Sequence, residues 1–415
     1  MGHVQDRWYR PEVDPTTKKV RKVKTSIHGK GQRYKVRYID PDGVERSRTF
    51  PDRCKKEAGD FLVEVESAKR EGKYVSVNAG KISFRAHAEN WLKGQSTDRA
   101  TRGALRSRLD ARIYPFFEKR PLNSITPAIV RNWLGELDDR GYSANYRTVL
   151  FTIVSSVLDS AVEERLITHN PCKAQTIKRP TSSASNIVIW PRTRLDAIEQ
   201  NISDRFRLAV TIGAGCGLRQ GEILGLAADD IEHNGMVVHV RRQIRTVERR
   251  LVFALPKGGK TRVVPLSPGV LGRISDHTRD HQPTDTALPW ENPDGQPVTA
   301  PLLITGDGGR LYSGDLFNKV IWQGAFRSAG ITYRKRADGM HALRHFFAST
   351  LLSQGVSIKE LAAYLGHSDP GFTLRTYTHL VPSSYERARA AIDGVFGRPR
   401  AAYPRPDHED ARRPT

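Results

Sequence analysis

The sequence predicts a multidomain α+β protein: a small three-stranded sheet plus one helix, then an all-α domain, then a mixed, mainly α domain. Three observations lead to this fold class. The chain has 415 residues, the length of two or three ordinary domains. Polar and apolar residues alternate near the N-terminus, as in strands, whereas apolar residues recur at helical spacing over 82–172. Both patterns occur between 187 and 396, so strands and helices are mixed there.

The N-terminal region divides into an arm and a domain. Residues 1–26 are polar and rich in Lys and Arg without steady periodicity, and we expect a flexible basic arm there. A domain is predicted over 27–78. It contains two alternating segments joined by a turn at Asp42-Gly43, followed by a helical pattern over 53–72.

The strands of this domain would give the sheet one cationic face. Tyr34, Val36 and Tyr38 alternate with basic residues, and the alternation continues beyond the turn. The basic residues are Arg33, Lys35, Arg37, Arg46 and Arg48. Such a face suits a reader of DNA grooves. The solvent face of a β-ribbon is also often basic merely for solubility, so the pattern alone leaves both interpretations open.

An all-helical domain is expected over 81–175. Ser83, Thr126 and Ser143 each precede a helical pattern and are candidate N-caps. The stretch KRPTSSASN is rich in Pro and Ser, which predicts a linker over 176–186.

The third domain is expected over 187–397. It begins with two helices interrupted at Gly213–Gly217 and continues with a three-stranded meander that turns at Gly258-Gly259. Residues 281–309 are rich in Pro, Gly and Asp and are expected to form a long surface insertion. The last residues, 398–415, have the composition of a disordered tail.

The net charge of +22 suggests a polyanionic partner. Positive charge predominates in every region, which fits a protein lying along nucleic acid better than one with a single basic tail. The cysteines, Cys54, Cys172 and Cys216, lack the spacing of a metal site or a disulfide framework, so we expect buried, reduced thiols. No apolar leader is present, and no run approaches the roughly 18 apolar residues of a membrane span.

Four short stretches carry residues able to do chemistry. GLRQGE holds Arg219 and Glu222, LPKGGK holds Lys257 and Lys260, HALRH holds His341 and Arg344, and LGHSDPGFTLRTY holds His367 and Tyr377. Taken singly, each has an ordinary explanation: a surface ion pair, a chance match, a solvated turn or core packing. A second His-x-x-Arg match, His239 and Arg242, does occur in the predicted meander.

Taken together, these residues are suited to phosphoryl transfer. Arg219 and Arg344 can present planar donor forks to the non-bridging oxygens of a phosphodiester, where charge builds in the transition state. Tyr377 can attack phosphorus, but a pKa of about 10 means that it needs a neighbouring base or a positive field. Lys257 on a mobile turn can protonate the departing alkoxide.

The sequence shows no carboxylate cluster of the kind that holds catalytic magnesium, so we expect neither a metal nor another cofactor. Attack by tyrosine stores the free energy of the phosphodiester in a phosphotyrosine. Another DNA hydroxyl can reverse that bond, so strand exchange of this kind requires no ATP.

The order of these motifs resembles that of the tyrosine recombinases, the lambda-integrase family. GCGLRQGEILGL, HALRHFFAS and LGHSDPGFTLRTYTHL are similar to the family's motifs, and the catalytic resemblance covers about 187–396. It implies that Tyr377 is the nucleophile that forms a 3′-phosphotyrosine, and that Arg219 and Arg344 bind the phosphate. Lys257 would be the general acid, and His341 and His367 would assist proton transfer or position the phosphate. Glu222 would orient its neighbours. Lys260 lies close enough in the sequence to compete with Lys257.

The resemblance also implies roles for the other regions. The helical region is similar to the family's core-binding domain, and the N-terminal sheet and helix resemble the arm-binding domain of phage and integrative-element integrases. The implied partners are double-stranded DNA with attachment sites of core and arm type, three further copies of the chain in a tetramer, an excisionase and a host DNA-bending protein. The implied location is the cytoplasm, at the bacterial nucleoid.

Two features near the C-terminus bear on regulation. Asp369 and Pro370 form a helix break that puts His367 and Tyr377 on separate elements, so the tyrosine could swing toward the phosphate or withdraw. Residues 382–397 have the pattern of an amphipathic helix. By resemblance it would pack on a neighbouring subunit, although it could instead pack on its own domain.

Three other functions would make use of some of these residues. A type IB topoisomerase uses the same tyrosine chemistry but would relax any supercoiled DNA, and the arm-like domain argues against it. A DNA-binding protein descended from a recombinase should have lost catalytic residues, whereas here every one of them is present. A magnesium nuclease is disfavoured by the missing carboxylate cluster.

Overall fold

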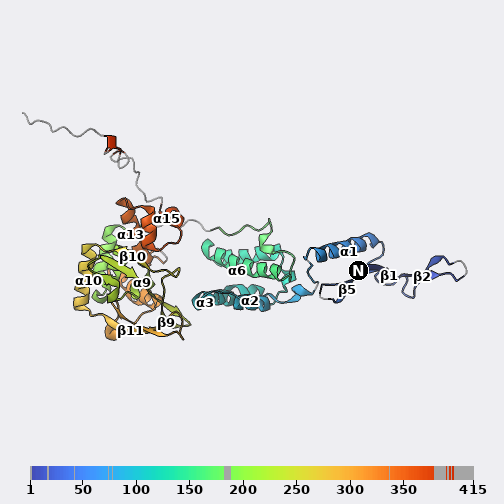
Figure 1. Cartoon of the computed structure of the whole chain (residues 1–415), viewed down its shortest axis with the longest axis horizontal. Coiled ribbons are helices and arrows are strands. Elements are labelled where there is room, and N and C mark those ends of the chain that lie inside the picture. The colour runs from blue at the N-terminus through green and yellow to red at the C-terminus, as the bar shows by residue number, and fades with distance from the viewer. Residues whose placement is uncertain are drawn as a thin grey trace, which may run out of the picture. The chain divides into compact units, whose positions relative to one another are not determined.

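A computed structural model of the chain shows the α+β fold class that the sequence predicts (Figure 1). The structure describes residues 2–15, 18–41, 43–72, 74–76, 78–181, 188–335 and 337–377, together with 389, 392, 393, 395 and 396. The chain forms two compact units, Met1–Ser185 and Asn186–Thr415. The second part of the predicted linker (182–186), most of the helix expected at 382–397 and the whole tail at 398–415 lie outside the described residues.

The N-terminal sheet has the strand order β1-β4-β5, all antiparallel. Its strands are β1 (His3–Asp6), β4 (Tyr34–Ile39) and β5 (Glu45–Phe50), and α1 (Lys55–Arg70) covers one face. Tyr34, Val36 and Tyr38 are buried beneath Ala58 and Val65 of that helix. The two-residue alternation thus sets the covered face of β4, as predicted.

The expectation of a flexible arm at 1–26 is wrong for most of its length. β1 is the third strand of the sheet, and β2 (Tyr9–Val13) pairs with β3 (Val20–Lys24) in an antiparallel hairpin. Arg33 stabilises the base of the hairpin by contacts with residues of the neighbouring segments. Its guanidinium bonds Asp6 at 2.9 Å and Asp52 at 3.0 Å, and it also stacks on aromatic rings. These contacts stabilise a segment whose own composition is mainly polar.

The rest of the first unit is helical. Its elements are α2 (Phe84–Lys93), α3 (Arg99–Arg108), a π-helical turn (Leu109–Ile113), α4 (Tyr114–Phe117), α5 (Pro127–Asp139) and α6 (Ala144–Glu163), with short 3-10 turns at Ala79–Lys81, Leu122–Ser124 and Pro171–Lys173. Ser83, Thr126 and Ser143 cap α2, α5 and α6 by accepting backbone N–H groups, as predicted. The apolar faces meet around buried Phe117 and Trp133.

The second unit has helices around several short strands. Its helices are α7 (Arg192–Asn201), α8 (Asp204–Cys216), α9 (Gln220–Leu224), α10 (Pro268–Asp280), α11 (Gly314–Phe317), a π-helical turn (Asn318–Trp322), α12 (Gln323–Ser328), α13 (His341–Ser353), α14 (Ile358–Leu365) and α15 (Pro370–Tyr377). Its strands are β6 (Ile231–Glu232), β7 (Val237–Val240), β8 (Gln243–Val247), β9 (Arg250–Ala254), β10 (Arg262–Pro265), β11 (Thr284–Pro289) and β12 (Pro297–Leu302).

The glycines of α8 allow close packing rather than break the helix. A Cβ at Gly213 would lie 2.6 Å from Leu343 Cδ1 of α13, and one at Gly215 would lie 2.7 Å from Val270 Cγ2. The helix ends at Gly217, the last residue of the predicted interruption, which has φ +66°. This tight contact between α8 and α13 brings the two arginine motifs together.

Two further expectations for this unit are corrected. The meander is split between two sheets, because β10 pairs with β7 in the sheet β10-β7-β6 whereas β8 pairs with β9. The segment 281–309 is no surface insertion. It contains the β11-β12 hairpin, whose Ala300 and Leu302 are buried in the core of the unit. The sequence did not indicate this hairpin because prolines and glycines lie among the apolar residues that alternate along β12.

No helix in the described part of the chain has the length and apolar character needed to cross a bilayer.

Candidate active site

Glu222 and Arg219 form the base of the site. The left-handed turn at Gly217 ends α8, and Arg219 then begins α9, so that Glu222 lies in its first turn. The Glu222 carboxylate is buried, and it accepts the Arg219 backbone N–H at 2.8 Å and Arg219 Nη1 at 2.9 Å. The predicted pair is therefore an anchored contact within a buried network rather than a surface ion pair.

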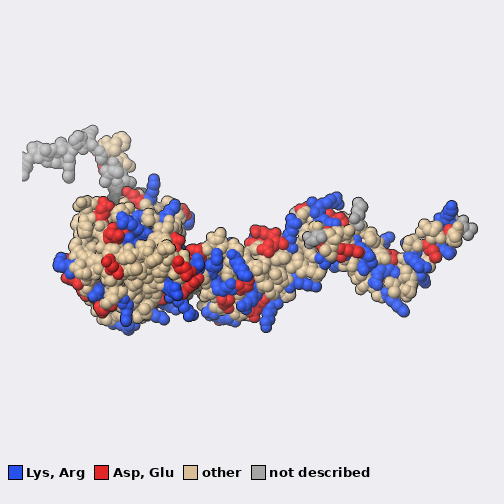
Figure 2. Space-filling view, turned by 60° about the horizontal axis from the view of Figure 1, so that its bottom comes forward, with Lys and Arg blue, Asp and Glu red and all other residues tan. Residues whose placement is uncertain are grey.

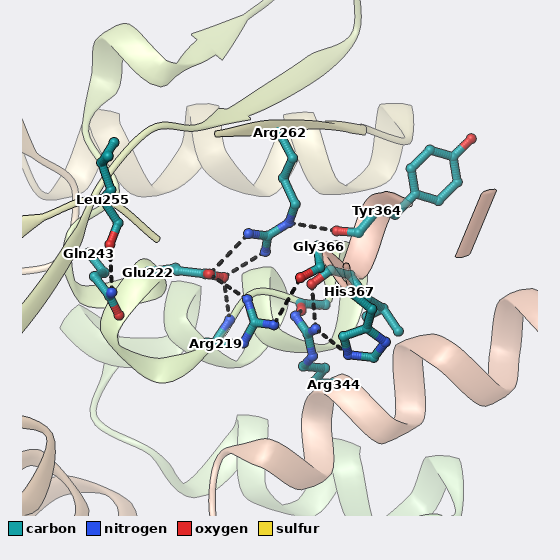
Figure 3. Close-up of polar contacts among 11 residues, drawn as sticks. Arg219, Glu222, Gln243, Leu255, Arg262, Arg344, Tyr364, Gly366 and His367 are labelled. Atoms are coloured by element: carbon teal, nitrogen blue, oxygen red, sulfur yellow. Dashed lines mark hydrogen bonds and ion pairs between the residues drawn. The ribbon is translucent and has the colours of Figure 1, made fainter. Parts of the chain in front are cut away.

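Arg262, which the sequence analysis did not single out, completes this network (Figure 3). From β10 it donates to Glu222 through Nη1 at 3.0 Å and Nη2 at 2.6 Å, and its Nε donates to the Tyr364 carbonyl at 2.7 Å. Burial alone would raise the pKa of Glu222, but its contacts with Arg262 and Arg219 hold that pKa below the usual value. A charged residue opening the apolar TRVVPL segment was the only sequence signal.

Arg344 is almost fully buried and is held by backbone carbonyls. Its Nη1 donates to the Gly217 carbonyl at 2.8 Å, and its Nη2 donates to the Leu365 carbonyl at the end of α14. Arg219 Nη2 contacts the next carbonyl, that of Gly366, at 3.4 Å. Burial and the charge of Arg219 lower the pKa of Arg344 to about 9, which leaves it protonated at neutral pH.

His367 lies against Arg344 with both ring nitrogens engaged. Its Nε2 is 3.1 Å from Arg344 Nη2, and its Nδ1 is 2.7 Å from Thr373 Oγ1 of α15. Since a guanidinium can only donate, Nε2 accepts and the ring hydrogen lies on Nδ1, directed at Thr373. Burial and the charge of Arg344 lower the pKa of His367 to about 4, so the ring is neutral at pH 7.

Tyr377 ends α15 and is 1% exposed. Its hydroxyl lies 2.8 Å from Nδ1 of His345, a second residue that the sequence analysis did not assign. Burial raises the pKa of Tyr377 to about 12, although the charge of Arg344 opposes the increase. Burial also lowers the pKa of His345, to about 3. His345 closes the HALRH motif, one turn after His341, and that spacing was the available signal.

His341 lies at the more open part of the site, within reach of the charge of Lys257. The exposed His341 ring begins α13 and packs edge-on against His345, with centroids 4.6 Å apart. Surrounding protein and the charges of Arg344, Arg219 and Lys257 lower the pKa of His341 to about 4. Lys257 and Lys260 are exposed on the loop between β9 and β10. The structure therefore brings together the two arginines, Glu222 and His367, with Tyr377 and His341 joined to them through α13.

The five basic residues predicted to share one face of the N-terminal sheet do not. In the β4-β5 register, Arg48 faces Val36 and Arg46 faces Tyr38, so both lie on the side that α1 covers. Arg46 bonds the buried Asp40 at 2.9 Å, and Arg48 stacks on Phe61 of α1. On the other, open face are His3, Gln5, Lys35, Arg37, Ser47 and Thr49.

Of the residues that were expected to bind DNA, Lys35 and Arg37 remain on the open face. Arg37 contacts Glu45 at 3.2 Å, whereas Lys35 makes no ion pair with any described residue. With the β2-β3 hairpin this face borders a groove of about 770 Å³ whose basic lining residues are His3, Arg7, Arg10, Lys22, Lys35 and Arg37.

Other candidate chemistry is limited. Within the described ranges, no three or more His, Cys, Asp or Glu side chains gather as a metal site would require. Cys172 and Cys216 are buried free thiols, and Cys54 is a half-buried one.

Comparison with known proteins identifies related sequences. A model described as the phage integrase family matches residues 193–383, and one described as the phage integrase central domain matches 84–177. Together they cover more than half of the chain. The integrase of Mycobacterium phage L5 is 27% identical over 354 residues, which are 83% of this chain and 90% of the relative. The integrase of Mycobacterium phage D29 is 25% identical over 387 residues, 91% and 95% of the two chains.

Solved structures show the same fold. The Tn1549 transposon integrase in complex with transposon right end DNA aligns with a TM-score of 0.62 at 18% identity, covering 76% of this chain and 100% of that one. A lambda integrase tetramer bound to a Holliday junction aligns with a TM-score of 0.55 at 17% identity, covering 82% and 91%.

Proposed function

Because the chain belongs to the phage integrase family of tyrosine recombinases, enzymes that cut and rejoin DNA, we propose that it is the integrase of a mobile element. It integrates and excises the element by site-specific recombination through a 3′-phosphotyrosine, without ATP or a metal. The observation that carries this proposal is the convergence of Arg219 and Arg344 on consecutive carbonyls at the end of α14. Two guanidinium groups held at one point form a receptor for a phosphodiester.

The first chemical step follows from this arrangement. The scissile phosphate binds between Arg219 and Arg344, and the oxygen of Tyr377 forms a bond to phosphorus while the bond to the 5′ oxygen breaks. The proton of the Tyr377 phenol passes to the neutral ring of His341. Lys257 donates a proton to that departing oxygen. The DNA 3′ end is then joined to the tyrosine, and the free 5′ hydroxyl leaves. Attack by a 5′ hydroxyl from another strand reverses the step and returns the proton.

The histidines act as neutral groups in this scheme. His367 is fixed between Arg344 and Thr373, so it orients the arginine that binds the phosphate. His341, at the open part of the site, is placed to relay a proton. Its depressed pKa keeps it neutral and able to accept one at pH 7.

The remaining regions bind DNA in this proposal. The 187–397 domain cuts, the helical 81–175 domain holds the core site, and the 27–78 domain with its N-terminal strands contacts arm-type sites. Figure 2 shows Lys and Arg distributed over all these parts of the surface. The basic groove beside Lys35 and Lys22 suits a phosphate backbone.

The proposal also covers the assembly on DNA and the partner proteins. A lambda integrase relative was solved as a tetramer on a Holliday junction, which supports a tetramer on DNA here. An excisionase and a host DNA-bending protein are the partners that arm-type sites require, and the protein works at the bacterial nucleoid.

The test is to denature cells that express the protein, recover DNA covalently attached to it and sequence the ends. Tyr377→Phe is the control. Adducts at one or a few recurrent sites, absent from the control, are expected and would reveal the attachment site. Adducts scattered over the genome would favour a type IB topoisomerase instead. If a plasmid carrying the element's flanking DNA also gave no adduct, the proposal would be wrong.

A further inference from the structure

Tyr377 cannot touch DNA where it now lies. A phosphodiester can contact only atoms that solvent can reach, and Tyr377 is 1% exposed. Its helix turns Thr373 and Tyr377 inward, while Phe372 and Leu374 are about half exposed. Attack therefore requires the tyrosine to leave its present place.

One hydrogen bond defines that place. The Tyr377 hydroxyl lies 2.8 Å from His345 Nδ1, and the two rings are 5.6 Å apart at 62°. No other polar partner of this hydroxyl occurs among the described residues. His345 directly follows Arg344 on α13, so a single helix carries a phosphate-binding arginine and the residue that holds the tyrosine.

We propose that His345 is a positioning residue that holds Tyr377 in a buried resting place through its Nδ1, and that this bond must break before the tyrosine reaches the phosphate. The proposal rests on the assignment of Tyr377 as the nucleophile. Release without DNA would leave Nδ1 of the half-buried His345 without its partner, which disfavours premature release. DNA that draws the tyrosine to the arginines would offset that loss.

The pair is not arranged as an acid and base in the resting state. The pKa of Tyr377 is raised to about 12 and that of His345 lowered to about 3, so the proton stays on the tyrosine. Burial and the charge of Arg344 oppose protonation of His345. His345 therefore holds the phenol without activating it.

The first experiment measures the accessibility of Tyr377 in the full-length protein without DNA. Tetranitromethane nitrates accessible tyrosines, and peptide mass spectrometry follows Tyr377, with the half-buried Tyr333 as an internal reference. In His345→Leu we expect nitration of Tyr377 to rise about tenfold, the factor expected from one lost buried hydrogen bond. His345→Asn, whose amide replaces Nδ1, should stay as slow as the parent, whereas His345→Gln should not.

The outcomes distinguish the loss of one specific hydrogen bond from a general loosening of the protein. If Tyr333, which packs on Phe326 in the core of the same unit, reacts faster together with Tyr377, the unit has merely loosened and the proposal is wrong. Equal nitration of Tyr377 in the parent and in His345→Leu would also overturn it.

The second experiment measures covalent complex formation in a single turnover on a nicked duplex carrying the attachment site mapped above. His345→Leu should form the phosphotyrosine several-fold faster than the parent, and His345→Asn should match the parent. If His345→Leu cleaves more slowly than the parent and His345→Asn is equally slow, His345 does not hold Tyr377 back. The proposed function would be unaffected by that result. If Tyr377→Phe still forms the complex, the proposed function itself fails.

Discussion

Arg262 holds the carboxylate of Glu222 through two parallel contacts of 3.0 and 2.6 Å, although forty positions separate the two residues in the sequence. Both side chains are nearly inaccessible to solvent. Since Glu222 also binds Arg219, this pair connects the strand β10 to one of the two arginines proposed to bind the phosphate. The connection has a measurable energetic consequence.

Replacing Arg262 with alanine should destabilise the protein by about 3–5 kcal/mol, because the Glu222 carboxylate would remain buried without its main partner. Chemical denaturation monitored by circular dichroism measures the loss. Arg279→Ala is the matched control, since it removes an exposed pair with Asp276 and should cost less than about 1 kcal/mol. Equal effects of the two substitutions would contradict the role given to Arg262.

Replacing Lys257 with alanine should abolish single-turnover cleavage of an ordinary duplex, whereas Lys260→Ala should cleave it nearly normally. The reason is that, in the proposed step, the departing 5′ oxygen takes its proton from Lys257. A substrate with sulfur in place of that bridging oxygen has a leaving group that needs none. Lys257→Ala should therefore recover cleavage on the sulfur substrate. The opposite behaviour of the two lysine variants would reassign the acid to Lys260.

Stability should fall as the pH drops from 7 toward 4. The pKa values of His341, His345 and His367 are lowered to about 4, 3 and 4 in the folded protein, whereas the unfolded value is about 6.5. Between these values the unfolded chain binds more protons than the native one, so stability rises with pH there and is lost on acidification. Denaturation midpoints measured at pH 7, 6 and 5 test this.

His345→Asn is the control for that measurement. This variant lacks one of the three titrating groups. The number of protons taken up on unfolding, which sets the slope of stability against pH, should therefore be smaller by about one. An unchanged slope would mean that His345 does not titrate in this way.

Lys35→Ala should weaken binding of the full chain to a mixed-sequence duplex and reduce the dependence of log K on log salt by about 0.9, the effect of one lost phosphate contact. Arg46→Ala should leave that dependence unchanged, because Arg46 pairs with the buried Asp40 on the covered face. It should instead destabilise the protein, because the buried Asp40 would lose its partner. Identical salt dependences for Lys35→Ala and the parent would exclude Lys35 from the DNA interface.

Gly213→Ala should destabilise the second unit by about 1–3 kcal/mol, because the new Cβ would meet Leu343 of α13. Gly272→Ala is the matched control. It lies in α10 with no atom near its Cβ position, and helix propensity should make it stabilising by about 0.5–1 kcal/mol. Thermal unfolding distinguishes them, and a neutral Gly213→Ala would show that α8 and α13 can separate easily.

Local patterns in the sequence were enough to predict the helices, their caps and the covered side of β4. Ser83, Thr126 and Ser143 act within a few residues of themselves, so neighbouring sequence determines what they do. The motifs likewise pointed to Arg219 and Arg344, which lie together because α8 and α13 pack closely.

What the sequence could not supply was long-range pairing. The register that puts Arg46 and Arg48 on the covered face depends on where β5 meets β4. The third strand of the N-terminal sheet comes from residues that look unstructured alone, and Arg33 holds them by contacts with Asp6 and Asp52. Arg262 and His345 also gain their importance from partners far away in the chain.

The turn at Gly366 has a genetic consequence. Its φ is +64°, a Cβ there would lie 3.0 Å from Arg262 Cδ, and its carbonyl contacts Arg219. The preceding carbonyl, that of Leu365, accepts from Arg344. A turn that favours glycine thus lies against three guanidinium groups, those of Arg219, Arg262 and Arg344. A selection for recombination-defective alleles should find missense changes at codon 366 as readily as at the codon of the tyrosine itself.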